Sequence, residues 1–182
     1  TRMAPGPRPP GLAALARAKV AAPAAEAPVN VVSPAMPEGQ VRISQEFAGM
    51  KDDPDAVQAE LLKRNRDLMS SDITIRGQDG EGALSLEILS GNLEDIGPIS
   101  ALTELRTLIC GNPWAREEGR LRDLAAIGNL SLTTLVAANG RITDLTPLKN
   151  MRLEKLDLMR TRVRDIVCLK GMPLAYLDLS ST

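Results

Sequence analysis

Apolar residues recur at a fixed spacing through residues 83–182, and this repeat limits the possible folds more than any other feature of the sequence. Seven positions define the pattern, and its clearest copy contains Leu132, Leu135, Ala137, Ile142, Leu145, Leu148 and Met151. The same positions return 21 residues later, and two earlier copies and one partial later copy extend the series. Because a unit of this length cannot bury its own apolar side, the units are expected to stack and share a core.

The repeat divides this part of the chain into units 83–104, 105–131, 132–152, 153–173 and the partial unit 174–182. The second unit has 27 residues because it contains an insert, "GNPWAREEGRL". An aspartate occupies one offset in each complete unit, at Asp95, Asp123, Asp144 and Asp165. The side-chain oxygen of an aspartate can cap a short helical turn, so each unit is expected to contain such a turn.

Two segments, "LTTLVAANGRITDLTPLKNM" and "LEKLDLMRTRVRDIVCLKGMP", resemble the short class of leucine-rich repeats, which includes the bacterial internalins and the threonine-ending repeats of planctomycete proteins. The resemblance covers residues 83–182. It implies an α/β solenoid, a curved array in which each repeat adds one short parallel strand to a concave sheet and returns through turns. Members of this family mostly bind other proteins on the concave sheet.

The sequence departs from this family at the end of each strand. The family's asparagine is replaced there by Gly91, Pro113, Gly140, Thr161 and Thr182. A threonine hydroxyl can bond to neighbouring backbone, whereas glycine and proline have no side-chain group that can do so. Looser turns are therefore expected in the first three units than in the last two.

Residues 51–82 are expected to form a capping helix and a short strand ahead of the repeats. Asp53 suits the N-cap of the helix, and Pro54 suits its first turn. Ile73 and Ile75 alternate with polar residues, which is typical of a half-buried strand. The helix would cover the open core of the first repeat. A helix that binds a partner is the alternative.

Residues 1–50 are rich in proline and alanine and cannot build a core of their own. Only residues 12–22 could form a short helix. The segment is either a flexible linker or an extended arm that becomes ordered on a partner.

The first 25 residues of the chain contain basic side chains and no acidic ones. This composition resembles the remainder of an organelle transit peptide, so a chloroplast or mitochondrion is favoured over the cytoplasm. An arbitrary boundary of the chain is the alternative.

The composition gives no support for catalysis. The chain has no histidine, which removes the commonest general base and metal ligand. "GQDGEG" at 77–82 lacks the lysine of a phosphate-binding loop. Cys110 is expected in the core and Cys168 in a return loop, with no disulfide between them. We therefore expect neither an enzyme nor a bound cofactor or metal.

The net charge of −1 gives no indication of nucleic acid as a partner. The sequence contains no apolar run long enough for a membrane span. The expected partners are other protein subunits. They would cover the N-terminal arm and the open C-terminal edge, where the chain stops after a strand.

Alternation along the strands predicts which residues the sheet presents to a partner. Leu89, Ile109, Val136, Ala138 and Met159 would form an apolar docking strip, and Tyr176 would lie on the same face. The alternative is that these are single exposed apolar residues, which are common on protein surfaces.

The insert carries the only tryptophan of the chain and is the clearest candidate for a contact loop. Trp114, with Arg116 and Arg120, is the first choice because aromatic and arginine side chains are favoured interface anchors. Packing of Trp114 over the edge of the array is the alternative. Arg141 and Arg162 share one offset and could form a basic ridge for an acidic partner, or a solvated edge.

These expectations favour a non-catalytic scaffold subunit of a larger assembly. An organellar photosynthetic, respiratory or ribosomal complex would suit the composition of the N-terminal segment. The alternative is a freestanding recognition module, or a regulatory domain, that binds one protein on its concave face.

Overall fold

The computed structural model describes residue 42, residues 45–77 and residues 83–182 of the chain. All of these belong to one compact unit, Met36–Thr182. The expected N-terminal arm lies outside the described residues except for its last few positions, and so does the expected short helix at 12–22. Residues 78–82, which include most of "GQDGEG", also lie outside them.

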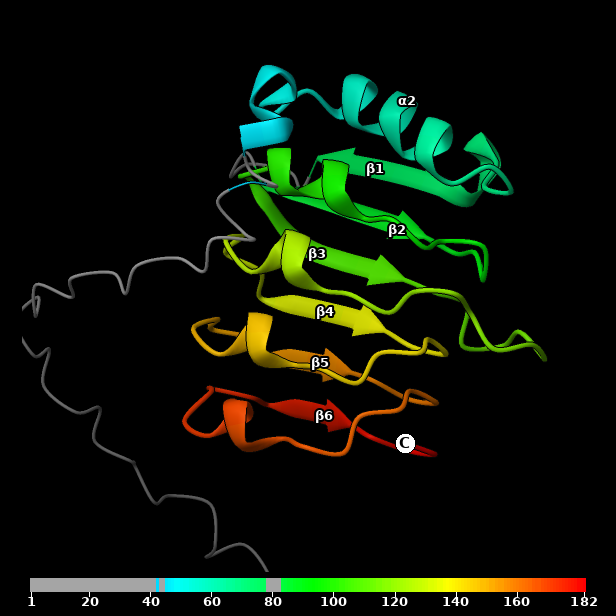
Figure 1. The fold of residues 1–182 in the computed structure, drawn as a ribbon. Coiled ribbons are helices and arrows are strands. Elements are labelled where there is room, and N and C mark those ends of the chain that lie inside the picture. Colours follow the sequence, from blue (N-terminus) through cyan, green and yellow to red (C-terminus); the bar gives the residue numbers. More distant parts are fainter. Residues whose placement is uncertain (1–41, 43–44, 78–82) are drawn as a thin grey trace, which may run out of the picture. The chain divides into compact units, whose positions relative to one another are not determined.

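Six strands form a single sheet whose spatial order follows the sequence (Figure 1). The first pair is an antiparallel hairpin, and every later pair is parallel. The strands are β1 (Ile73–Gly77), β2 (Leu84–Ile88), β3 (Leu105–Cys110), β4 (Thr134–Ala137), β5 (Lys155–Asp157) and β6 (Tyr176–Asp178). Each parallel strand comes from the first part of one repeat, so the stacking expected from the leucine spacing is present.

The leucines of the repeat are in register across the sheet. The second leucine of each unit pairs with that of the next, in the order Leu86, Leu108, Leu135, Leu156 and Leu177. Because side chains alternate between the two faces of a strand, this register turns one apolar row toward the core and leaves the neighbouring rows on the outer face.

Each complete repeat returns through a 3₁₀ turn that begins after an aspartate. The turns are η3 (Gly97–Ala101), η4 (Ala125–Ile127), η5 (Thr146–Leu148) and η6 (Val167–Leu169). The Oδ1 atoms of Asp95, Asp123, Asp144 and Asp165 accept the backbone N–H two residues later at 2.7, 2.7, 2.8 and 2.8 Å. The predicted aspartate caps are therefore confirmed. One strand and one turn per unit is the plan that the resemblance to leucine-rich repeats implies.

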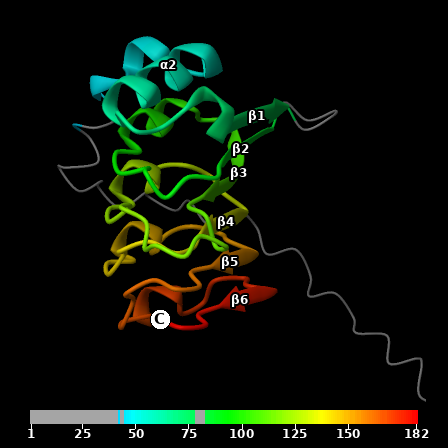
Figure 2. The ribbon, with the colours of Figure 1, turned by 90° about the vertical axis from the view of Figure 1, so that its right-hand side faces the viewer.

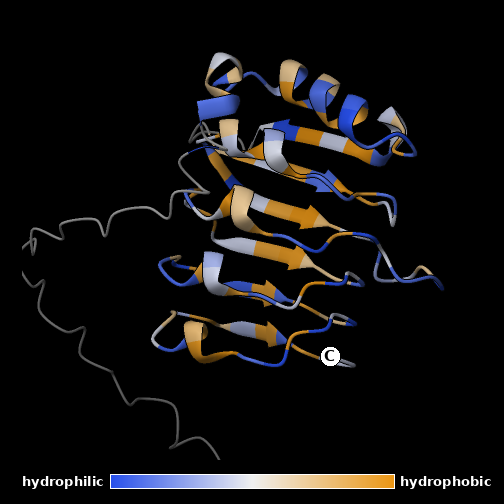
Figure 3. Cartoon of the chain, viewed as in Figure 1, coloured by the Kyte–Doolittle hydropathy of each residue, from blue (hydrophilic) through white to orange (hydrophobic). Residues whose placement is uncertain are grey.

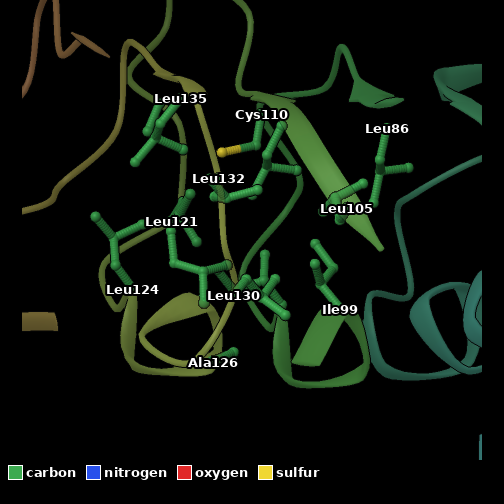
Figure 4. Close-up of a cluster of buried hydrophobic side chains, with 14 of the residues drawn as sticks. Leu86, Ile99, Leu105, Cys110, Leu121, Leu124, Ala126, Leu130, Leu132 and Leu135 are labelled. Atoms are coloured by element: carbon green, nitrogen blue, oxygen red, sulfur yellow. The ribbon is translucent and has the colours of Figure 1, made fainter. Parts of the chain in front are cut away.

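The core lies between the sheet and the 3₁₀ turns, which run along opposite sides of the unit (Figure 2). It is filled by leucine and isoleucine side chains from both layers, such as Leu135 from the sheet and Leu124 from a return (Figure 4). Cys110 is completely buried among them, as expected, and burial raises the pKa of its thiol to about 12. Cys110 and Cys168 are both free thiols.

The helix α2 (Pro54–Arg64) begins where the sequence predicts. Asp53 Oδ1 accepts the N–H of Ala56 at 3.1 Å, and Pro54 occupies the first turn. The buried side chains of Val57 and Leu61 join the same apolar core as the repeats. Short 3₁₀ segments precede and follow the helix, η1 (Ala48–Met50) and η2 (Ser70–Asp72). The role of α2 as a cap and the curvature of the sheet stay predictions.

Asn65 joins the end of α2 to the first return turn, a connection that the sequence did not reveal. Its buried side-chain amide donates to the carbonyls of Leu61 and Asp95 at 2.8 and 2.9 Å. Its side-chain oxygen accepts the N–H groups of Glu94 and Asp95 at 2.8 and 2.9 Å. All of its hydrogen-bonding capacity is therefore used to fix the helix against the first repeat.

Candidate functional site

The outer face of the sheet, which points away from the 3₁₀ turns, is open. No described helix or 3₁₀ turn lies over it (Figure 2). Two rows of side chains cross it in register, with one residue from each of the parallel strands β2 to β6. The first row, which we call the central row, is Glu87, Ile109, Val136, Asp157 and Asp178. The second row is Ser85, Thr107, Thr134, Lys155 and Tyr176.

The middle of the central row is apolar. Ile109 and Val136 are adjacent on β3 and β4, and both are half-buried. Figure 3 shows that these two strands are the most hydrophobic part of the sheet. Leu89, just beyond β2, is 42% exposed, and Met159 beyond β5 is half-buried. Four of the five residues expected in the docking strip are thus accessible from solvent.

Ala138 does not belong to this strip, because the residue is only 1% exposed. It follows β4 at the point where the backbone of Gly111 passes so closely that an added Cβ would lie 2.2 Å from the Ala138 carbonyl oxygen. The next residue, Asn139, donates to the carbonyls of Asn112 and Glu117, so the base of the insert adjoins this end of β4. The expectation from alternation alone was therefore wrong at this position.

Carboxylates stand on both sides of the apolar pair. Glu87 precedes it and Asp157 and Asp178 follow it in the central row. Asp157 Oδ1 accepts the N–H of Met159 at 2.9 Å, and Asp178 Oδ1 accepts that of Ser180 at 2.8 Å. Within the part of the chain that the structure describes, no salt bridge involves any of the three carboxylates.

Tyr176 lies on this face, as expected, at its β6 edge. Its ring has the Lys155 ammonium at 5.3 Å from the centroid, and its hydroxyl donates to Asp178 Oδ2 at 3.3 Å. Loss of hydration, followed by the negative charges of Asp178 and Asp157, raises the pKa of the hydroxyl. The phenol therefore stays neutral and able to donate at neutral pH.

The insert extends beyond the carboxyl end of β3 and is fastened by a later repeat (Figure 1). The Arg160 guanidinium donates to three insert carbonyls, those of Pro113 at 3.3 Å, Ala115 at 2.8 Å and Arg116 at 3.5 Å. Because one planar guanidinium donates to three carbonyls of the insert, it holds the tip of the loop against the repeat array.

Asn139 fastens the base of the same loop. Its buried side-chain amide donates to the backbone carbonyls of Asn112 at 3.0 Å and Glu117 at 2.8 Å. The backbone carbonyl of Asn139 accepts the Gly119 N–H at 2.7 Å. Sequence reasoning missed this residue, although the pair Asn139–Gly140 is a turn signal. Asn112 and Ser90 likewise bond to backbone in the first two units. The residue before each glycine or proline therefore supplies the side-chain bond whose absence led us to expect looser turns.

The arginines of the expected basic ridge turn toward the insert. Arg162 donates from Nε and Nη2 to the two Glu118 oxygens at 2.6 and 2.7 Å, and Arg141 Nε donates to Glu118 Oε2 at 3.1 Å. Hydrogen bonding from Arg162, more than any other influence, lowers the pKa of Glu118. Arg120 similarly pairs with Asp67 at 2.7 Å. These three cations hold the loop, which reduces the charge that they can offer a partner.

Trp114 is 82% exposed at the tip of this fastened loop. It therefore does not pack over the edge of the array. The guanidinium of Arg116 is exposed beside it in sequence and forms no salt bridge with any described residue. Of the three insert residues singled out from the sequence, Trp114 and Arg116 are therefore exposed and in no salt bridge among the described residues, whereas Arg120 is paired with Asp67.

No group of three or more cysteine, aspartate and glutamate side chains among the described residues is placed to hold a metal ion. None of the helices in that part of the chain has the length and apolar character needed to cross a bilayer. The accessible features are therefore the sheet face and the insert.

The chain matches no protein-family model and no curated protein sequence, but it is similar to solved structures, among them an internalin structure. That structure is the crystal structure of an internalin C2 from Listeria monocytogenes str. 4b F2365. The sequence identity is 31% and the TM-score is 0.40. The match covers 46% of this chain and 36% of the internalin chain, which is less than two thirds of either.

Proposed function

We propose that this chain is a protein-interaction module that binds a segment of one partner protein on the outer face of its sheet, with Trp114 as an anchor at one side. The observation that carries the proposal is the tryptophan itself, 82% exposed on a loop that Arg160, Asn139 and Glu118 tie down. An exposed indole buries almost no apolar surface and so adds little to folding stability.

The fastening of the loop supports a binding role for its tip. Ordering a flexible loop on binding costs about 0.5–1.5 kcal/mol for each side chain that is immobilised. A loop that is already held avoids most of this cost, and a tryptophan offers a large contact area with few rotatable bonds. Trp114 on a rigid scaffold therefore has the properties of an interface anchor.

The choice of a recognition module over a scaffold subunit follows from the same residues. A partly apolar open face, together with an exposed aromatic on the loop that follows β3, suits one ligand segment of limited size. Membership of a larger organellar assembly, and with it the location of the protein, stays a prediction.

Replacement of Trp114 tests the proposal. The full chain, the Trp114→Ala variant and a Val167→Ala control are immobilised and used to capture proteins from an extract of the source organism, with quantitative mass spectrometry as the readout. Val167 is a suitable control because it is 75% exposed and lies on η6, away from the insert. Loss of an anchor worth about 2 kcal/mol should lower retention of the specific partner roughly 30-fold.

The control should retain the same partner as the unaltered chain. Melting temperatures of all three proteins should agree, because neither side chain is packed. If the Trp114→Ala variant retained the partner as well as the unaltered chain, the indole would not be a binding anchor. A lowered melting temperature in that case would assign it a packing role instead.

A further inference from the structure

We infer that the partner segment is an extended peptide that places a basic side chain on each side of an apolar one, lying along the central row of the sheet. The inference rests on the proposed function, since it names the chemistry of the segment that the sheet face would bind. It depends on the order of charges in the row, the spacing between strands and the distribution of cations on the face.

The order of the row is acidic, apolar, apolar, acidic. Glu87, Ile109, Val136 and Asp157 come from four consecutive parallel strands and pair directly with one another. Neighbouring strands lie about 4.8 Å apart, so the midpoint between Ile109 and Val136 is about 7 Å from the backbone of Glu87 on one side and of Asp157 on the other.

An extended peptide has almost the same period. It rises about 3.3 Å per residue, and alternate side chains point the same way, so side chains on one face are about 6.6 Å apart. A segment that crosses the strands with an apolar residue over Ile109 and Val136 brings its residues at −2 and +2 over Glu87 and Asp157. Basic side chains at these two positions would meet both carboxylates in one register.

The cations of the face stand outside this row. Arg76 and Lys155 belong to the neighbouring row, with Arg76 paired to Ser85 at the β1 end and Lys155 engaged with the Tyr176 ring. Asp178 extends the negative charge beyond Asp157. The central row therefore presents only carboxylates around its apolar centre, which favours basic over acidic residues in a ligand.

A cavity on the opposite side of the described unit offers no comparable set of free charges. The cavity of about 350 Å³ between α2 and the first returns has Glu46 and Asp95 among its lining residues, and both already pair with Arg64. The sheet face is where charge and apolar surface remain accessible together.

Fluorescein-labelled synthetic peptides test the inference on the full-length chain by fluorescence polarisation. The matching peptide has the core Lys-Ser-Ile-Ser-Lys between glycines. A shifted peptide of the same composition has the core Lys-Lys-Ile-Ser-Ser, and an acidic peptide has glutamate in place of both lysines. The matching peptide should bind at least tenfold more tightly than the other two, with an affinity that falls as salt is raised.

A pair of matched variants locates the binding on the row. Glu87→Gln with Asp157→Asn removes two charges and keeps the Asp157 turn acceptor. Glu94→Gln with Asp55→Asn removes two charges from exposed positions away from the sheet face. The first variant should bind the matching peptide at least tenfold more weakly, the second should bind it normally, and both should melt at the temperature of the unaltered chain.

Equal affinity for the matching and shifted peptides would overturn the inference, because it would show general charge attraction without a register. Tighter binding of the acidic peptide, unchanged binding by the Glu87/Asp157 variant, or no binding of any peptide would also overturn it. The partner-capture experiment separates this failure from that of the proposed function. A partner lost with Trp114→Ala but retained by the Glu87/Asp157 variant would leave the function standing and reject the basic segment.

Discussion

Left-handed backbone recurs at one place in successive repeats. Asn139, Arg160 and Ser181 have φ values of 57°, 56° and 60° and are 21 residues apart. Asparagine adopts this conformation readily, whereas for most other side chains it costs about 1–2 kcal/mol. At Arg160 the cost is accompanied by three hydrogen bonds from the guanidinium to the insert. The left-handed residue of this repeat, Arg160, is therefore also the residue whose side chain fastens the candidate contact loop.

Gly111 is the position where one added methyl group should do most damage. Its φ is +90°, and a Cβ there would lie 2.2 Å from the carbonyl oxygen of Ala138. Gly111→Ala combines left-handed strain with a clash against backbone, so we expect it to lower the free energy of unfolding by about 3 kcal/mol or more. Urea denaturation followed by circular dichroism measures this change.

Gly77→Ala is the matched control, since an added Cβ there meets nothing within 4 Å and its φ lies outside the left-handed region. It should leave stability within about 0.5 kcal/mol of the unaltered chain. A Gly111 variant as stable as the Gly77 variant would mean that the backbone at Gly111 can move away from the Ala138 carbonyl at no cost in stability.

At the scale of elements, the turns and the insert differ in how much the sequence could reveal. The strands and the 3₁₀ turns are set by residues close together in the chain, namely the leucine spacing and an aspartate two residues before the N–H that it caps. The fastening of the insert depends on residues far apart. Arg160 reaches the carbonyl of Ala115 across 45 positions, and Glu118 meets Arg162 across 44. These contacts exist only because the repeats stack, so no local pattern predicts them.

The same reason explains the one error on the sheet face. Alternation correctly turns Ile109 and Val136 outward, because it is a property of a single strand. Ala138 was assigned to the same face, but it is buried where the base of the insert adjoins β4, and the path of an insert is not encoded in strand periodicity. Accessibility therefore could be predicted in the middle of the strands and not at the end where the insert departs.

The insert should become mobile when its fastening residue is removed. Arg160→Gln eliminates the guanidinium bonds to three insert carbonyls, each worth about 1 kcal/mol, and leaves the core untouched. The amides of Ala115 and Gly119 should then exchange with solvent at least tenfold faster. Because Trp114 is the only tryptophan, its fluorescence anisotropy should fall at the same time.

Arg164→Gln serves as the control for this prediction, since Arg164 is exposed and lies four residues further along the same repeat. It should leave the exchange rates and the anisotropy unchanged. If the two variants behave alike, the loop is held by its own turn and by Glu118, and Arg160 is dispensable.

For the whole molecule, stability depends on position in the stack. Equivalent leucines are fully buried in the inner strands, with Leu86, Leu108, Leu135 and Leu156 all at 0% exposure. In β6, which pairs only with β5, the equivalent Leu177 is 42% exposed. Each repeat is buried by its two neighbours, so an edge strand of the described sheet has about half of the contacts of an inner one.

The same leucine position can be truncated in an inner strand and in the edge strand, and the loss of stability compared. Leu135→Ala and Leu156→Ala should each lower the free energy of unfolding by about 3 kcal/mol, because each leaves a cavity in a closed core. Leu177→Ala should lower it by about 1 kcal/mol or less, since its side chain is already partly hydrated. Urea midpoints of the 182-residue chain measure these losses. Hydrogen exchange of the β4 and β6 amides tests the same gradient in the unaltered chain. The β6 amides should exchange faster because an edge strand can separate without opening the centre of the stack. A loss at Leu177 as large as at Leu135 would contradict the burial argument, because it would show that the Leu177 side chain is covered in solution as fully as an inner leucine.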